Sequence, residues 1–168
     1  MTLTGFEKVK QVILCCLTQE MTTNGLLEDV ETLENTYYRE AQVEEPVIWM
    51  TQHPTRINRN ADISGTVEVI TPFEFDCGVY EVEIEDADGK SQNLAWRTVG
   101  AIRKNWLNAQ AQVGTPRTIK RIDLDTYSPI GYVPVQGKSD KVAVTGVILN
   151  VIHILNWQQC CQQINNGE

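Results

Sequence analysis

The segment 141–157, KVAVTGVILNVIHILNW, is apolar on both alternating faces, and this limits the folds open to the chain. In an extended strand successive side chains point to opposite faces, so Val142 and Ile148 share one face while Val147 and Leu149 share the other. A strand with two apolar faces is typical of the middle of a covered sheet or of a subunit interface. We therefore predict that 141–157 is a central strand.

The length and composition indicate one folded domain over 1–168. The fractions of hydrophobic residues (42%) and charged residues (21%) are those of a globular protein and exclude general disorder. Asn150, His153 and Asn156 interrupt the longest apolar run, which falls short of the roughly 18 residues of a membrane span. We expect no membrane contact, and we expect the protein to be made in the cytosol.

Charge is unevenly placed along the chain. The net charge of −8 argues against a general nucleic-acid binder. Residues 20–45 are strongly acidic with Arg39 as the only strong base, whereas residues 90–121 contain bases and no acids. Two interpretations are open: solvated faces that differ in charge, or a head-to-tail contact in which the acidic segment of one subunit meets the basic segment of the next.

Periodicity divides the chain into a helical arm (1–43), a sheet with a central helix (44–157) and a polar tail (158–168). The arm has an amphipathic helix from Phe6 to about Met21. A second helix is predicted from Leu26 to Arg39.

The remaining elements are predicted to be four strands and one helix. Pro72 indicates an edge position or a bulge, and 78–85 either extends its strand or turns back beside it. The order α-(α)-β-β-α-β-β predicts an α+β fold with a mixed or antiparallel sheet. The strands cover 46–51, 63–76, 117–127 and 141–157, and a polar loop covers 52–60. The helix follows a turn at Asp88–Gly89 and runs from the N-cap Ser91 to about Asn108, and Gly114–Thr115–Pro116 separates it from the next strand.

Few residues offer catalytic or metal-binding chemistry. His53 and His153 are the only histidines. We predict that His53 is an exposed turn residue and that His153 is a hydrogen-bonded residue of the core or of an interface. The carboxylate pairs Asp123–Asp125 and Glu81–Glu83–Glu85 are expected on solvated strand faces, with a Mg²⁺ or Ca²⁺ site as the alternative.

The five cysteines have no disulfide or zinc spacing, so reduced and mostly buried thiols are expected. The alternative is a metal held by Cys160 and Cys161 with His153. We predict no catalytic residue, no cofactor and no metal site.

Two groups of residues are candidates for contacts with other molecules. Trp96 and Trp106 lie off the apolar stripe of the predicted central helix, which indicates either core packing or contact with a neighbouring subunit. The candidate subunit interface is Trp96, Arg97, Arg103, Lys104 and Trp106. The candidate loop facing a DNA-containing channel is Arg56, Arg59 and Asn60.

The layout resembles the tail terminator (tail completion) proteins of tailed viruses and related head–tail joining proteins. An amphipathic helix (6–17) is followed by the strand PVIWM (46–50), a polar loop with arginines and the alternating strand VEVITPFEF (67–75). The helix LAWRTVGAIRKNW (94–106) and the strands IKRIDL (119–124) and VAVTGVILNVIHI (142–154) complete the likeness. The arm over 22–42 and the cysteine pairs depart from the compact members.

The resemblance implies a structural subunit without catalytic residues. It would form a ring, expected to be a hexamer, that caps the tail tube and docks to the head–tail connector or head-closure protein. Non-specific contact with DNA in the channel, a place in the virion tail at the head–tail junction and assembly in the host cytoplasm follow. Alternatives are a tail tube or head-closure subunit, a small metal-dependent enzyme using Asp123, Asp125 or the Cys160/Cys161/His153 group, and an adaptor whose acidic arm binds a basic partner.

Overall fold

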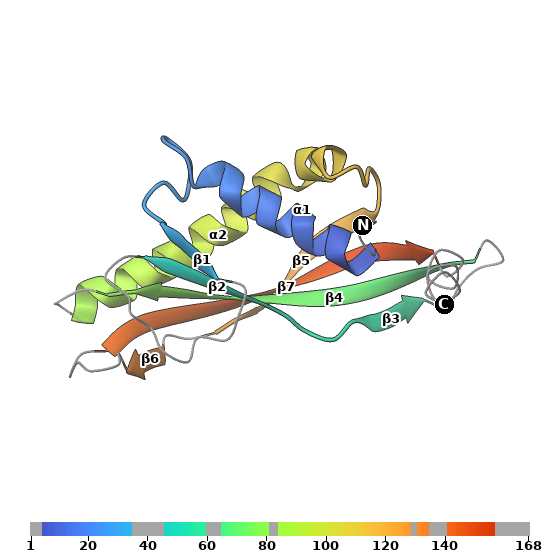
Figure 1. Ribbon diagram of the computed structural model, residues 1–168. Helices are drawn as coiled ribbons and strands as arrows, with labels where there is room; N and C mark the ends of the chain where they lie inside the picture. Colours follow the sequence, from blue (N-terminus) through green and yellow to red (C-terminus); the bar gives the residue numbers. More distant parts are fainter. Residues whose placement is uncertain are drawn as a thin grey trace, which may run out of the picture.

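The computed structural model describes residues 5–34, 46–59, 65–80, 84–128, 131–134 and 141–156. Helices α1 (Gly5–Glu20) and α2 (Ile84–Gln112) lie on one face of a seven-stranded mixed sheet (Figure 1). The predicted α+β class is confirmed. The strands are β1 (Thr32–Glu34), β2 (Val47–Gln52), β3 (Arg56–Arg59), β4 (Thr66–Val79), β5 (Ile119–Tyr127), β6 (Gly131–Pro134) and β7 (Lys141–Asn156).

Strand β7 is central, as its sequence predicts. Its neighbours are β4 on one side and β5 and β6 on the other, within the order β1-β2-β4-β7-β5. Val147, Leu149 and Val151 belong to the main core beneath the helices. On the opposite face, Val142 and Val144 form a smaller cluster with two residues of β2, Val47 and Trp49.

The amphipathic helix α1 is also confirmed, since Val9, Ile13, Cys16 and Leu17 are buried on one stripe. The second helix predicted over Leu26–Arg39 is wrong for its described part, where turns lead into β1. Residue Asn24 has a φ of 65°, and the chain then folds back onto the end of α1. There the Leu27 amide donates to the Glu20 carbonyl at 2.9 Å and the Leu26 amide donates to the Glu20 carboxylate at 2.9 Å.

Helix α2 begins seven residues before the predicted start at Ser91. Asp88 and Gly89, predicted as a turn, are helical, and Ser91 lies inside the helix. The buried Ser91 hydroxyl contacts the Asp88 carbonyl at 3.1 Å and the Thr145 hydroxyl of β7 at 2.8 Å. These contacts, together with acidic residues in the first turn, favour the longer helix.

The other end of α2 is Gln112, four residues beyond the predicted end near Asn108 and just before the separating segment Gly114–Thr115–Pro116. Gly114 has a φ of 76°, which a residue without a Cβ adopts without strain. The Thr115 amide donates to the Gln110 carbonyl at 2.9 Å, and the Gly114 amide donates to the Ala111 carbonyl at 3.2 Å. This pair of bonds is the Schellman arrangement, which satisfies carbonyls that a helix end leaves exposed.

Part of the predicted polar loop 52–60 is instead strand β3, which pairs with β4. Strand β4 runs to Val79, which settles 78–79 as an extension of the strand; 81–83 lie outside the described residues. Pro72 is in this interior strand, so an edge position is wrong. The His53 amide donates to the Pro72 carbonyl at 2.9 Å, in the interval between β2 and β3. Because the amide and carbonyl of one strand residue point the same way, the missing donor of Pro72 faces this interruption.

Candidate self-association surface

The two flanks of α2 face different parts of the chain. On one flank the turn segment 22–31 packs along the helix, with Arg97 contacting Asp29. On the other flank lies β5: Trp96 stacks on Tyr127, and the Gln110 side chain accepts a hydrogen bond from the Ile119 amide at 2.7 Å. We call these the turn flank and the β5 flank.

The β5 flank carries large apolar side chains at the surface. The rings of Trp96 and Tyr127 are stacked with centroids 5.5 Å apart and planes 12° apart. Trp96 is 50% exposed, Tyr127 37% and Leu124, on the same strand, 45%. We call these three residues the aromatic step. Trp106, ten residues from Trp96, is instead half-buried against the main core, so the two tryptophans have different environments.

Two of the predicted interface bases pair within the chain. Arg97 donates two hydrogen bonds to the Asp29 carboxylate, from Nη1 at 2.5 Å and from Nη2 at 3.0 Å, and holds the pKa of Asp29 below its ordinary value. Lys104 Nζ lies 2.8 Å from the buried Glu20 carboxylate. Hydrogen bonds from Lys104, Asn105 and the Leu26 amide lower the pKa of Glu20 to about 2. Acidic and basic segments therefore complement each other partly inside one subunit.

The remaining charges are separated between the two flanks. On the β5 flank, the exposed bases Arg103, Arg117 and Lys120 have no ion pair within the part of the chain that the structure describes. Arg121 is paired with Asp123 at 2.8 Å. Besides Asp29, which is paired with Arg97, the exposed acids of the turn flank are Glu28, whose carboxylate accepts from the Asn24 amide, and Glu31.

Strand β5 lies at one edge of the sheet, and Lys120–Thr126 are half-buried or exposed. Its register against β7 shifts between Ile119 and Arg121 and again between Leu124 and Thr126. Bulges and charged side chains on an edge strand hinder pairing with a strand of another molecule. This edge can therefore make side-chain contacts more readily than it can extend the sheet.

The candidate channel residues lie at the other side of the sheet. Arg56 and Arg59 belong to β3, and Arg56 is exposed. Asn60 lies outside the described residues. Contact between these residues and DNA stays a prediction.

Both histidines contact a polar group of β4. His153 is fully buried, with Nε2 2.8 Å from the Thr71 hydroxyl, which confirms the core prediction. Its Nδ1 has no partner among the described residues, its ring lies perpendicular to that of Phe6, and burial lowers its pKa to about 4. His53 is half-buried rather than a fully exposed turn residue, because its Nε2 lies 2.6 Å from the Glu74 carboxylate.

The neighbouring carboxyl of Asp76 lies on the face of the sheet opposite the helices. Burial, with a smaller contribution from the charge of Glu74, raises its pKa to about 6, and His53 opposes the rise. Two of the carboxylates in the alternative metal site have partners within the chain: Asp125 accepts from Asn150 at 2.8 Å, and Asp123 pairs with Arg121. Within the described segments, no group of three or more His, Cys, Asp or Glu residues could hold a metal ion.

The described cysteines are reduced. Cys16 and Cys77 are buried, which raises the pKa of each thiol to about 12, and Cys15 is half-buried. Cys160 and Cys161, the alternative metal ligands, lie outside the described residues.

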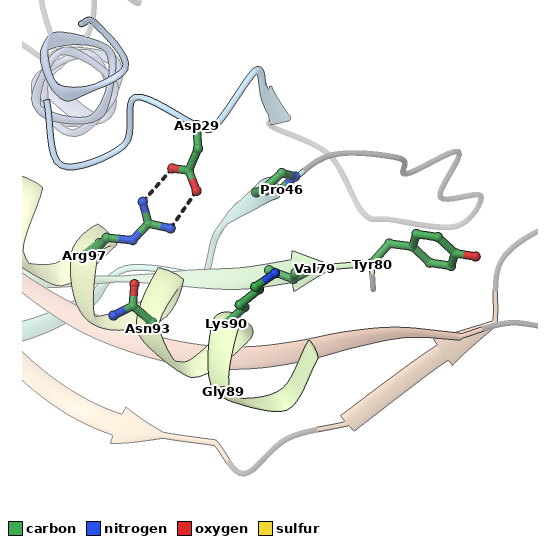
Figure 2. Close-up of a pocket in the computed structure, with 8 residues that line it drawn as sticks. All are labelled: Asp29, Pro46, Val79, Tyr80, Gly89, Lys90, Asn93 and Arg97. Carbon is green, nitrogen blue, oxygen red and sulfur yellow. Dashed lines mark hydrogen bonds and ion pairs between the residues drawn. The ribbon is translucent and has the colours of Figure 1, made fainter. Parts of the chain in front are cut away.

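A hollow of about 470 Å³ lies beside the turn flank, between the first turns of α2 and the end of β4 (Figure 2). Arg97 points across it toward Asp29, while the ring of Tyr80 extends away from this pair. The charged groups that line the hollow are thus largely the Arg97–Asp29 ion pair, which joins α2 to the turn segment. No helix among the described residues is both long enough and apolar enough to cross a membrane.

No protein-family model and no curated protein matches this chain. The interpretation of this surface as a self-association site therefore depends on the geometry of its own residues. Sequence reasoning found Trp96 but missed Tyr127 and Leu124, because their proximity to α2 depends on how β5 packs beside the helix. The alternation of β5 itself, with Ile122, Leu124 and charged residues between, was the available signal.

Proposed function

We propose that this chain is a structural subunit of a tailed virus, a tail terminator that forms a ring on the tail tube and joins it to the head–tail connector. The observation that carries the proposal is the aromatic step, three large side chains left 37–50% exposed beside a sheet edge. Trp and Tyr are enriched in the energetic centres of protein interfaces. Contiguous apolar groups on a surface are typical of a site that another protein covers.

The arrangement of the elements supports the same proposal. Both helices lie on one face of the sheet (Figure 1). Trp96 of α2 stacks on Tyr127 of the edge strand β5, so the helix flank and the sheet edge meet at the aromatic step. The order of the helices and the longer strands roughly matches the layout by which the sequence resembles tail terminators. A ring subunit acts through the shape and charge of such sides rather than through a reactive group.

Electron microscopy and analytical ultracentrifugation of the purified chain, with and without tail tubes, test this function. We expect rings that bind one end of each tube. Polymerisation of the chain into long tubes would identify a tail tube subunit instead. A monomer that binds neither tube nor connector would contradict the proposal, and stoichiometric bound zinc or manganese would support the enzyme alternative.

A pair of variants separates the aromatic step from general surface effects. Trp96→Ser removes its largest side chain, and Ile57→Ser removes a 60% exposed side chain on β3. Ile57→Ser should keep a near-wild-type melting temperature because its side chain is largely solvated. Trp96→Ser loses the stack on Tyr127, worth about 0.5–1.5 kcal/mol, so it should remain folded but melt a few degrees lower. Ring formation should weaken in Trp96→Ser and persist in Ile57→Ser.

A further inference from the structure

We propose that neighbouring subunits contact each other head to tail, with the β5 flank of one copy against the turn flank of the next. The β5 flank contributes the aromatic step with Arg103 and Lys120. The turn flank contributes Glu28, Glu31 and the 38% exposed side chain of Leu26. This contact deepens the proposed function by naming its subunit interface.

The two surfaces point in different directions from one subunit. Leu26 packs near Gly100 of α2, where an added Cβ would lie 3.5 Å from its side chain. Trp96 and Gln110 mark the β5 flank along the same helix. Because α2 separates them, one copy can use both flanks at once for two different neighbours.

The charges of the two flanks favour a second copy of the chain as the partner of each flank. The β5 flank has three exposed bases without an ion pair among the described residues, Arg103, Arg117 and Lys120. The turn flank has Glu28 and Glu31, while Asp29 is neutralised by Arg97 within the subunit. Opposite charges on a subunit's own two sides favour a second copy, and they disfavour contact between identical flanks.

Contact through side chains is the geometry that β5 permits. Its two register shifts and Lys120 hinder hydrogen bonding with another strand. The aromatic step lies on the helix side of this edge, where an apolar partner such as Leu26 can reach it. Because the two flanks differ, the contact is heterologous, and such a contact generates a ring where its rotation closes around an axis.

A charge-swap experiment tests the contact. In the first variant Arg103→Glu and Lys120→Glu make the β5 flank acidic; in the second, Glu28→Lys and Glu31→Lys make the turn flank basic. Each variant alone then places like charges in every contact. Mixed together they restore opposite charges in both kinds of contact. Lys10→Glu on α1, which belongs to neither flank, is the control.

We expect the wild type and the Lys10→Glu control to form rings, and each charge variant alone to need at least about tenfold more protein for assembly. An equimolar mixture should assemble like the wild type, with the two variants alternating. Circular dichroism and melting curves establish that each variant is folded. Glu31→Lys alone, which removes no hydrogen bond described here, replaces the double variant if the latter unfolds.

Unimpaired assembly of either folded variant, or a mixture that fails to assemble, would overturn the contact. Failure of the proposed function is recognised by different results. Wild-type rings that ignore tail tubes contradict the tail terminator but leave the contact intact. A chain that binds tubes but has no self-association sensitive to these charges contradicts the contact and leaves the function standing.

Discussion

Replacing the buried His153 by methionine should remove an acid sensitivity from the fold. In the native state burial holds the pKa of this imidazole at about 4, against 6.5 for the ordinary side chain. The unfolded chain therefore binds a proton at a higher pH than the folded chain does. The stabilising contribution of neutral His153 is complete above pH 6.5 and is lost as the pH falls toward about 4.

The size of the effect follows from this difference. Each pH unit in the interval costs ~1.36 kcal/mol, so the accumulated loss near pH 4 is about 3 kcal/mol. The group is fully buried and its Nδ1 lacks a partner among the described residues, so solvent gives little screening. Thr71 keeps its hydrogen bond to the Thr55 hydroxyl at 2.7 Å when the imidazole is removed.

Urea unfolding of the wild type and His153→Met, followed by tryptophan fluorescence over about pH 7 to pH 4, measures this loss. Taking the difference between the two proteins at each pH cancels all groups they share, including Asp76, which titrates in the opposite sense. The free energy of unfolding of the variant should rise relative to the wild type by about 3 kcal/mol across the interval. A difference that stays constant with pH would refute the reasoning.

Three other changes test the fold. Asp76→Asn should stabilise the protein above pH 6, because the raised pKa of Asp76 makes its ionisation in the folded state unfavourable. In denaturant titrations the free energy of unfolding should exceed that of the wild type by about 2 kcal/mol, and this gain should vanish as the pH falls toward 3.8. Glu20→Ala should cost about 3 kcal/mol in urea unfolding, since it removes the acceptor of the Leu26 amide and one of the two acceptors of the buried Asn105 amide, which keeps its bond to the Ala101 carbonyl. Lys104→Ala, at a 61% exposed side chain, should cost less than about 1 kcal/mol. Gly114→Ala should lower the unfolding free energy by about 1 kcal/mol, measured by thermal melts, because an L side chain is strained at a φ of 76°; an unchanged melting temperature would contradict the Schellman assignment.

The sequence predicted the elements whose own residues determine them. The doubly apolar segment of β7 identified the sheet centre, the stripe of α1 identified its buried face, and Gly114 marked the end of α2. In each case the signal lies within one element. The α+β class follows from the order of such elements.

The misses share a different cause, which is contact with residues outside the periodic pattern of the element itself. Leu26, Val30 and Leu33 have helical spacing, yet the Glu20 carboxylate captures the Leu26 amide and turns the chain. Asp88–Gly89 is a local turn signal, but Ser91 contacts Thr145, 54 positions later in the chain, within a longer helix. No local pattern contains these partners.

The candidate surface was predicted in part for the same reason. Trp96 stood out because it lies off the apolar stripe of its helix. Its partner Tyr127 comes from β5, and the pairing of Arg97 with Asp29 and of Lys104 with Glu20 joins segments far apart in the chain. Composition shows that both charge signs are present, but only the packing shows which charges remain for a partner.

The position of β7 also has a consequence for how the chain reaches its native state. It follows all the other described strands in the chain, yet it pairs along the full length of β4, joining Val67 to Leu155 and Val79 to Ala143. Until it emerges from the ribosome, β4 exposes Phe73, Phe75 and an unsatisfied backbone to the cell. Pairings so distant in sequence form slowly, and the waiting intermediate is prone to aggregate. A demand for chaperones during synthesis follows from placing the centre of the sheet so late in the chain.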